Sequence, residues 1–488
     1  MSLSRAMDLL LQSESLANLR MQRERHFPSP THAEQILKLS LQLKEEVTLA
    51  QAEISKLEAG IDALRAACAQ MVTQIAVNRS VPAPVHRLPP ELLADIFLYL
   101  PSSDNMRNEL CRLEYGIARV CTTWRAVALG LPRLWTCIDL QSINIDAELY
   151  LRQYLHRSQN HPLHIACDTG KQPGLLPLLS AHAALRWKTL TLRISSKSPL
   201  PDAMPTVVDT PLLQRLRMNI NGVGYDLEAP DLLAFLRRPP QLRELVVRGG
   251  SLVKTVVALP QAPSLECLHI FIIGPHRYTL LLASIQQYSA TLTTLRLGIA
   301  RIAPIDVLEE ATRGEIVTLP ALKYMRLYYE GHNLLRFISA PNLHTMSVDV
   351  DGLISSTVFL GFVERGGRRS DIRVLEVISV YPHLYVDKGG RETAALLCCL
   401  ARLEGLEHLR FVLYAAMDKV LEGLVWKDDA PQMLPNLQGL TIPGRLSGSS
   451  ALADLCRSRR MTTVSRGREV IAMAEGRRLK TLVHDLIL

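Results

Sequence analysis

The sequence predicts a mixed α and α/β protein with a long N-terminal helix, a small all-α module and then an α/β solenoid of repeated strand–helix units. Three observations support this prediction. Apolar residues recur at heptad spacing over residues 31–78, two short helix patterns follow in residues 85–136, and one leucine pattern returns along residues 137–446. Spacing near 3.5 residues indicates helices, and self-similarity at a period of about 20–50 residues indicates a solenoid.

Composition narrows the classes of function. The chain has 488 residues, of which 48% are hydrophobic and 21% charged, as in folded proteins of more than one domain. The net charge of +8 permits acidic partners without requiring nucleic acid, and the low aromatic content of 5% does not favour base stacking. Nine cysteines without a C-x-x-C pair indicate reduced thiols, so we expect a cytoplasmic or nuclear protein. We expect neither a signal peptide nor a membrane span.

The N-terminal region divides at a proline pair. Residues 1–30 form a tail with a short apolar helix over Met7–Leu19, and Pro28 and Pro30 separate it from the next helix. Thr31 is predicted to cap that next helix. Residues 79–84 contain Pro82 and Pro84 and are predicted to be a stiff linker.

The helix of residues 31–78 carries two apolar series, each with a period of seven. Together they form the seam of a coiled coil. The first series is Val47, Ile54, Ile61, Cys68 and Ile75, and the second is Ile36, Leu43, Ala50, Leu57, Leu64 and Met71. Two interpretations remain open: a coiled coil that pairs between chains or as a hairpin, or a single amphipathic helix packed on the chain's own N-terminal segment.

The all-α module of residues 85–136 begins with a helix start signal. Leu88 precedes two prolines, and a proline suits the first helical position, while Glu91 in the first turn complements the helix dipole. One broad apolar face is predicted from Leu92, Leu93, Ile96, Phe97 and Leu100. A second helix is predicted from Ile117, Val120, Cys121, Trp124, Val127 and Ala128, ending at Gly130 and Pro132.

The two blocks, Leu88-Pro89-Pro90-Glu91-Leu92 with Ile96-Phe97 and Val120-Cys121 with Trp124-Arg125, resemble an F-box. The resemblance implies docking on the small Skp-type adaptor of a cullin–RING ubiquitin ligase. The adaptor-facing residues that it implies are Leu88, Pro89, Leu92, Leu93, Ile96, Phe97, Leu100, Val120, Cys121 and Trp124. The connector Ser102–Tyr115 is long and polar for this family. A helix, a proline linker and an F-box in this order resemble a large group of fungal F-box proteins.

The repeated pattern of residues 137–446 is leucine, two residues, leucine, one residue, apolar. Its copies start at Leu213, Leu242, Leu265, Leu292, Leu322, Leu343, Ile372, Leu406 and Leu437, with an earlier copy at Trp187. One copy cannot bury its leucines alone, so neighbours stack into a shared core. The pattern resembles leucine-rich repeats, with return helices predicted at Asp231–Arg238 and Tyr278–Tyr288. Residues 447–488 are predicted to be a basic helical cap that includes Val470, Ile471 and Met473.

Residues between the repeated leucines point away from the core and form a second candidate surface. Arginine suits two-pronged recognition of carboxylate and phosphate groups. The candidate residues for binding a substrate are Arg217, Arg296, Tyr324, Arg326 and Arg410. Either this is an ordinary solvated face, or it binds an acidic or phosphorylated segment.

Catalytic and metal motifs are not found in the sequence. Gly222-Val223-Gly224 is interpreted as a turn, and His161, His164 and Cys167 lack a fourth ligand for a metal. Cys398 and Cys399 are interpreted as core residues. No cofactor is expected. The sequence therefore favours a non-catalytic substrate receptor of a ubiquitin ligase. The alternatives are a scaffold without a ubiquitination target and a nucleic-acid-associated repeat protein.

Overall fold

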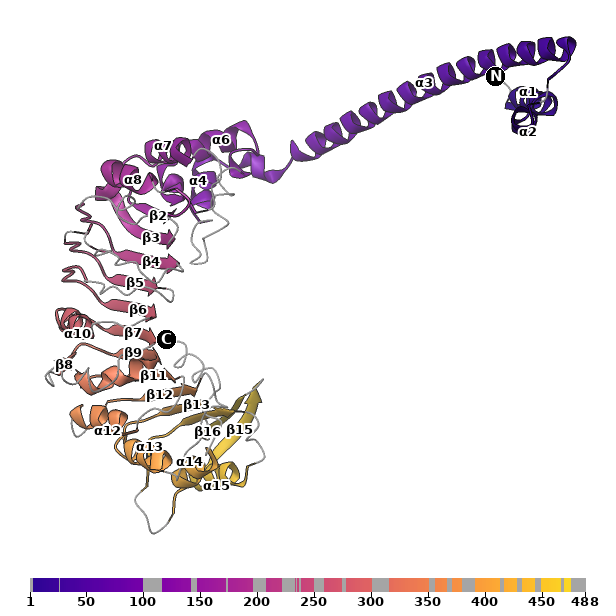
Figure 1. Cartoon of the computed structure of the whole chain (residues 1–488). Coiled ribbons are helices and arrows are strands. Elements are labelled where there is room, and N and C mark those ends of the chain that lie inside the picture. Colours follow the sequence, from indigo (N-terminus) through magenta and orange to yellow (C-terminus); the bar gives the residue numbers. More distant parts are fainter. Residues whose placement is uncertain are drawn as a thin grey trace. The chain divides into compact units, whose positions relative to one another are not determined.

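A computed structural model gives the arrangement of the chain (Figure 1). It describes residues 3–25, 27–99, 116–141, 147–172, 174–195, 208–221, 233, 235–236, 238–249, 259–273, 278–300, 316–350, 356–366, 371–379, 391–412, 417–427, 432–443, 449–466 and 469–474. The chain divides into two compact units, Met1–Leu92 and Leu93–Leu488.

The N-terminal unit is helical. Its helices are α1 (Leu3–Leu16), α2 (Leu19–Arg23) and the long α3 (Pro30–Ser80). The predicted cap of α3 was wrong by two residues, because Ser29 is the N-cap and its Oγ accepts the His32 N–H at 3.4 Å. Pro30 then occupies the first helical position, where the missing N–H of proline has no helical partner to lose.

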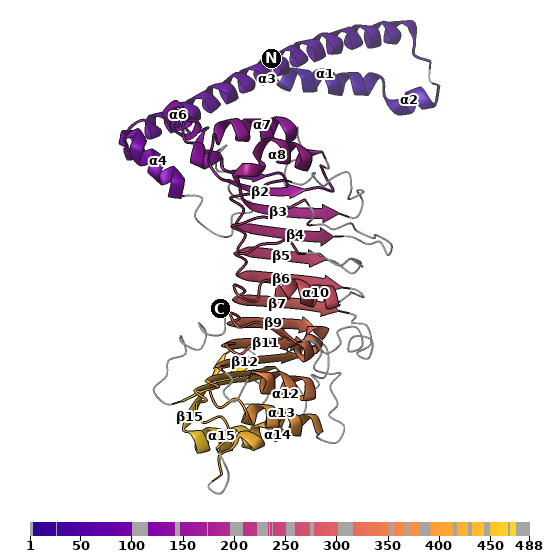
Figure 2. The same cartoon turned by 90° about the vertical axis from the view of Figure 1, so that its left-hand side faces the viewer.

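Helix α1 lies beside the N-terminal half of α3 (Figure 2). Arg5 Nε of α1 lies 3.6 Å from Glu46 Oε1 of α3, and Leu39 of α3 is buried. The N-terminal half of α3 therefore packs on the chain's own first helix, as one of the two open interpretations expected. From Ile54 onward the seam residues of α3 are exposed.

The all-α module contains η1 (Pro84–Arg87), α4 (Pro90–Tyr99), α6 (Thr122–Leu129) and η3 (Pro132–Trp135). Helix α4 begins at Pro90, the second of the two prolines that predicted a helix start. The second helix does not run through from Ile117, because Cys121 is extended and its Sγ accepts the Trp124 N–H at 3.4 Å as the N-cap of α6. Leu100 and the connector Ser102–Tyr115 lie outside the described residues.

The rest of the second unit is built on one sheet of 14 strands. In spatial order the strands are β1 (Cys137–Asp139), β2 (Leu163–Asp168), β3 (Trp187–Ser195), β4 (Arg215–Asn221), β5 (Glu244–Gly249), β6 (Cys267–Ile273), β7 (Thr294–Ala300), β9 (Tyr324–Tyr329), β11 (Thr345–Val350), β12 (Val374–Ser379), β13 (His408–Val412), β14 (Gly439–Pro443), β16 (Glu469–Ala474) and β15 (Met461–Arg466). Pairing is parallel from β1 to β14.

Helices lie on one side of this sheet (Figures 1 and 2). They are α7 (Ala147–Arg157), α8 (Leu175–Ala183), η4 (Ala184–Arg186), α10 (Tyr278–Gln286), η5 (Glu330–Phe337), α12 (Ser356–Arg365), α13 (Arg391–Ala401), α14 (Met417–Leu424) and α15 (Ser450–Arg459). A separate two-stranded sheet pairs β8 (Val317–Thr318) with β10 (Ile338–Ser339). The described part of the chain contains no helix long and apolar enough to cross a membrane.

The repeated leucines form the core in exact strand register. The second apolar residue of each copy pairs with its counterpart in the next strand, from Leu216 through Leu245, Leu268, Leu295, Met325, Met346, Leu375 and Leu409 to Leu440. All of these side chains are buried. The predicted α/β solenoid is therefore confirmed, and its repeats stack their leucines as expected.

Prolines that precede the repeats have a defined role in the turns. In the six copies with a proline two residues before the first leucine, the N–H of that leucine bonds to the carbonyl oxygen three residues earlier, as in Leu242 N–H to Pro239 O and Leu343 N–H to Ala340 O. The intervening prolines, such as Pro240 and Pro341, thus occupy the second position of a β-turn, which suits their fixed φ.

Two predictions of helix were wrong. Leu236, in the segment predicted as a return helix, forms an isolated parallel bridge with Val208, and Pro239 disfavours a helical backbone at Arg238, directly before it. In the described part of the tail, residues 449–466 and 469–474, only α15 is helical. Ile471 and Met473 lie in strand β16, where they extend the sheet beside β14. The return helix predicted at Tyr278–Tyr288 is confirmed as α10.

Candidate interaction surfaces

One side of α4 forms the core of the small helical module. Leu93 and Phe97 are buried, and the ring centroid of Phe97 lies 5.1 Å from that of Trp124 on α6. Trp135 Nε1 donates to the Ala128 carbonyl at 2.9 Å. Three of the residues that the sequence assigned to the adaptor surface, Leu93, Phe97 and Trp124, therefore also hold the module together.

The helical module continues directly into the solenoid. The Trp135 ring meets Tyr154 of α7 edge-on, with centroids 5.1 Å apart, and the Arg157 guanidinium lies 4.3 Å from the centre of the Trp135 ring. Trp135 and Tyr154 are both buried. Because this core is shared, removing the module would expose the first helix of the solenoid.

The other side of α4 presents apolar residues to solvent. Leu92 is 50% exposed and Ile96, one turn later, is 46% exposed. Val120, before α6, is 53% exposed. Pro89 is exposed as well, and Leu88 and Cys121 are half-buried. Large apolar side chains gathered on a short helix indicate a protein-binding surface.

On the sheet, the side chains between the leucines form rows. The central row runs in register from Arg217 on β4 through Val246, His269, Arg296, Arg326, Ser347, Glu376 and Arg410 to Thr441 on β14. The substrate-site candidates Arg217, Arg296, Arg326 and Arg410 thus share one face. Tyr324 lies on the same face, two residues before Arg326.

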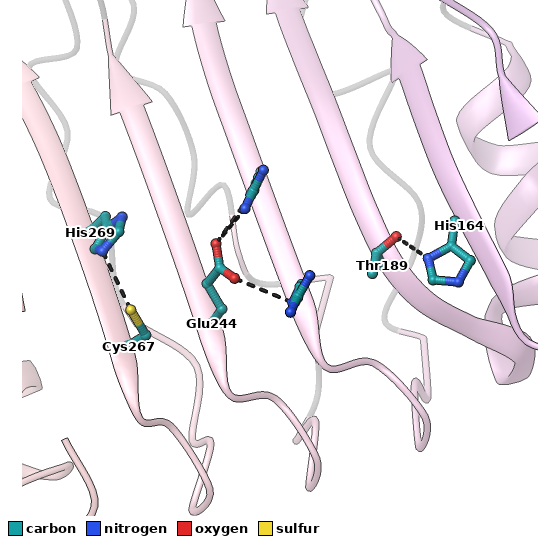
Figure 3. A network of polar contacts seen from close by, with 7 residues as sticks. His164, Thr189, Glu244, Cys267 and His269 are labelled. Atoms are coloured by element: carbon teal, nitrogen blue, oxygen red, sulfur yellow. Dashed lines mark hydrogen bonds and ion pairs between the residues drawn. The ribbon is translucent and has the colours of Figure 1, made fainter. Parts of the chain in front are cut away.

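Carboxylates from neighbouring strands neutralise most of these arginines. Glu244 Oε1 lies 2.9 Å from Arg217 Nη2, and its Oε2 lies 3.4 Å from Arg215 Nε (Figure 3). Arg326 Nη2 lies 3.0 Å from Asp349, and Arg410 Nη1 lies 3.3 Å from Glu376. These pairs stiffen the face and reduce its positive potential.

Arg296 differs from the other arginines of the row. It has no ion-pair partner among the residues that the structure describes. It is the register neighbour of Arg326, although like charges directly opposite each other on adjacent strands are destabilising. The guanidinium of Arg296 lies 5.1 Å from the Tyr324 ring centre, and that of Arg326 lies 4.9 Å from the Tyr328 ring centre. Two adjacent arginines beside tyrosine rings are well placed to receive an anionic group.

The face is accessible on only part of the sheet. In the central row, Arg217, His269, Arg296, Arg326 and Arg410 are partly exposed, whereas Val246, Ser347, Glu376 and Thr441 are buried. The longest run of partly exposed residues therefore lies on the consecutive strands β6, β7 and β9, which form the open part of this face.

Two histidines belong to this face but carry little charge near neutral pH. His164 Nδ1 lies 2.9 Å from Thr189 Oγ1, and His269 Nε2 lies 3.4 Å from Cys267 Sγ (Figure 3). Burial, followed by the charges of Lys188 and Arg215, lowers the pKa of His164. Burial, followed by the charge of Arg296, lowers the pKa of His269 to about 4.

Lowering the pH from 6.5 to 4.5 is expected to destabilise the solenoid through His269. An unfolded histidine has a pKa of about 6.5, so in this window the unfolded chain binds more protons than the folded one, and the free energy of unfolding falls. A pKa shift of this size corresponds to a loss of ~3 kcal/mol in the free energy of unfolding. Because His269 is partly exposed, solvent screening reduces the expected loss to ~1–2 kcal/mol. Urea unfolding at both pH values should show that His269→Gln loses this part of the pH dependence. Exposed His182→Gln is the control, and an unchanged pH dependence in His269→Gln would contradict the assignment.

The metal and thiol candidates of the sequence do not come together as a site. His164 and Cys167 alternate on strand β2, with Cys167 buried in the core, where burial raises its pKa to about 12. Within the described ranges, no group of three metal-ligating side chains is found. Cys399 is buried in α13, as expected of a core residue, whereas Cys398 is exposed. Gly222-Val223-Gly224 lies outside the described residues.

Three residues that shape the open face were not recognised in the sequence. Glu244 and Asp349 neutralise arginines from rows two residues before and after the central row, and Phe271 packs edge-on to Tyr328. Gly298, between these two rings in the register, leaves room for Phe271, because a Cβ there would lie 2.2 Å from the ring. Aligning the rows two positions either side of the central one would have found all three.

Comparison with known protein families supports the first surface. The model of the F-box-like family matches residues 85–141. No curated protein sequence matches the chain. The matched region contains α4, α6 and η3, and it implies binding to a Skp-type adaptor. The family match says nothing of the source organism. Residues 85–141 are therefore an F-box-like domain, and the long parallel sheet that follows is consistent with a leucine-rich-repeat-like domain.

Proposed function

We propose that this protein is the substrate-recognition subunit of a cullin–RING ubiquitin ligase. The F-box-like domain binds the Skp-type adaptor and, through it, the cullin, while the repeat sheet holds a target protein. The chain itself makes or breaks no bond. It accelerates ubiquitin transfer by raising the effective concentration of the target beside the transferring enzyme.

The observation that carries the proposal is the two-sided character of α4 within the matched domain. Leu93 and Phe97 are buried inside the domain, whereas Leu92 and Ile96 remain exposed on the same helix. Complete burial of a leucine or isoleucine side chain contributes about 1.5–3 kcal/mol. A few such anchors are sufficient for a stable complex.

Co-expression of the full chain with a Skp-type adaptor tests this role. A stable one-to-one complex is expected on size exclusion. Failure of the intact, folded chain to bind the adaptor would overturn the proposal. A complex that binds cullin but transfers no ubiquitin to any bound protein would instead favour the scaffold role.

For the target, we place the binding site on the open face of the sheet around Arg296 and Arg326. Their adjacency leaves an excess of positive charge that an acidic or phosphorylated segment would neutralise, and the rings of Tyr324 and Tyr328 flank it. Arg217, Arg326 and Arg410 are each paired with a carboxylate, so Arg296, which has no ion-pair partner among the described residues, supplies the excess charge and the paired arginines shape the face.

Replacing Arg296 by glutamate is expected to weaken the binding of acidic probe peptides. Paired phosphoserine and unphosphorylated peptide arrays provide the probe, and binding should weaken by at least about 10-fold, the equivalent of one charge-assisted hydrogen bond. The control is Arg243→Glu, an exposed arginine next to β5. Equal loss in both variants would indicate a diffuse charge effect. Binding of nucleic acid with a steep salt dependence, in place of the peptides, would favour the nucleic-acid alternative.

A further inference from the structure

The C-terminal half of α3 carries an apolar seam that nothing in the described structure covers. Ile54, Leu57, Ile61, Leu64 and Met71 are between 48% and 69% exposed. Cys68, in the same seam, is exposed too. In the N-terminal half, where α1 packs, Ile36, Leu43 and Ala50 of the seam are half-buried, although Val47 is 53% exposed.

A solvated helix of this kind lacks its main source of stability. Helices in proteins gain most of their stability by packing an apolar face, and Gly60 within this stretch lowers its intrinsic helix propensity. An unbroken apolar stripe on such a helix indicates a binding surface. The residues also have the identity that a coiled coil requires, with β-branched Ile54 and Ile61 at one seam position and Leu57 and Leu64 at the other.

We propose that this half of α3 binds the same segment of a second copy of the chain, as an antiparallel coiled coil. Its centre lies between Ile61 and Leu64, so that Ile61 of each copy packs against Leu64 of the other. Leu57 then faces Cys68 of the second copy, and Ile54 faces Met71. The paired stretch spans about 27 Å, with apolar side chains in every layer.

Charged residues beside the seam select the antiparallel direction. In the antiparallel arrangement, Glu58 of each copy flanks Arg65 of the other, giving two attractive pairs. In a parallel arrangement, Glu53 of each copy would instead flank Glu58 of the other, giving two repulsive pairs. Charges at these flanking positions set the orientation of coiled coils. Both Glu58 and Arg65 are exposed, and the exposed pair of Arg65 with Asp62 of its own helix, at 3.3 Å, is weak enough to exchange for Glu58 of the second copy.

The extent of α1 agrees with this arrangement. Helix α1 already lies antiparallel on α3, with Arg5 beside Glu46, and the side that it covers ends near Ala50. The proposed partner segment begins where α1 stops, so it continues the same antiparallel packing along the seam. The proposed centre of the coiled coil lies near the middle of the uncovered stretch of α3. The uncovered residues before and after this centre can therefore pair with those of the second copy.

Sedimentation of the full chain tests the self-association. The expected species is a dimer with twice the chain mass of 54.4 kDa, and Leu64→Asp should weaken it at least 100-fold. Ala66→Asp adds the same charge on the outer side of the helix and should leave the dimer intact. A monomeric intact chain, or equal sensitivity to both substitutions, would overturn the proposal.

Charge reversal tests the direction. Glu58→Arg and Arg65→Glu should each weaken the homodimer about 5- to 10-fold, and mixing the two variants should restore binding. If Glu58→Arg strengthens the dimer, the helices are parallel, because the new arginine would then face Glu53.

Disulfide trapping provides a readout that does not depend on affinity. Under mild oxidation, Leu57→Cys should cross-link to Cys68 of the second copy, and adding Cys68→Ser should abolish the cross-link. A cross-link through Cys68 alone in the intact chain would show the parallel arrangement and overturn the proposed one. These measurements need no ligase adaptor, so their outcome is independent of the proposed function.

Discussion

Replacing Leu92 and Ile96 together by aspartate abolishes binding of the Skp-type adaptor, with a loss of at least about 100-fold in affinity. Both side chains are exposed one turn apart on α4, so the substitutions should change the stability of the uncomplexed protein little. In the complex, however, each aspartate would place an unpaired carboxylate in an apolar interface, which costs several kcal/mol. Isothermal titration of the purified full chain with the adaptor measures the effect.

An exposed leucine outside the F-box-like domain provides the matched control. Leu185→Asp, at a position that is 64% exposed, should bind the adaptor like the intact chain. Trp124→Ala is a poorer test of the interface, because Trp124 packs on buried Phe97 and its loss would also destabilise the domain. Unchanged affinity in the Leu92 and Ile96 double variant, with the fold intact by circular dichroism, would move the adaptor site elsewhere.

Replacing Arg459 by alanine is expected to lower the free energy of unfolding by about 3–5 kcal/mol. Arg459 is buried at the end of α15, where burial lowers its pKa to about 10. Its guanidinium donates to the Leu424 carbonyl at 2.9 and 3.0 Å, to the Leu434 carbonyl at 2.8 Å, and to the Met433 carbonyl. The guanidinium also lies 4.6 Å from the Trp426 ring centre. Removing it takes the guanidinium donors from three carbonyl oxygens, although Leu434 O still accepts the Leu437 N–H and Met433 O still accepts the Trp426 Nε1–H.

Chemical unfolding of two further variants separates this role from charge. Arg459→Lys keeps the charge but loses the planar guanidinium group. The free energy of unfolding of this variant should therefore lie between that of Arg459→Ala and that of the intact chain. Arg457→Ala removes an exposed arginine that pairs with Asp454 on the same helix and should change stability by less than about 0.5 kcal/mol. Similar stabilities of Arg457→Ala and Arg459→Ala would contradict a capping role for Arg459.

The sequence predicted the architecture well where one periodic pattern controlled it. The leucines at Leu216, Leu245 and Leu268 identified not only the strands but also their register. Local exceptions were less visible. Cys121 interrupts a run with apolar helical spacing because its extended backbone caps a new helix, and Ile471 joins a strand because β14 offers an open edge.

The candidate surfaces were only partly visible in the sequence. The F-box pattern located α4, but it did not separate buried Phe97 from exposed Ile96, since both belong to one apolar run. On the sheet, the row of arginines was correctly aligned. The carboxylates that neutralise these arginines were not recognised in the sequence, because Glu244 and Asp349 lie in adjacent rows.

The sequence by itself determined the order of the modules, the leucine core of the repeats and the long helix, because each depends on a local pattern of apolar residues that recurs along the chain. Only the tertiary structure decided which apolar residues remain uncovered and which charges remain unpaired. Those properties depend on side chains that meet across strands and helices far apart in sequence. Exposed Leu92 and Ile96, the lack of an ion-pair partner for Arg296 among the described residues, and the open seam at Ile61 and Leu64 all have this origin.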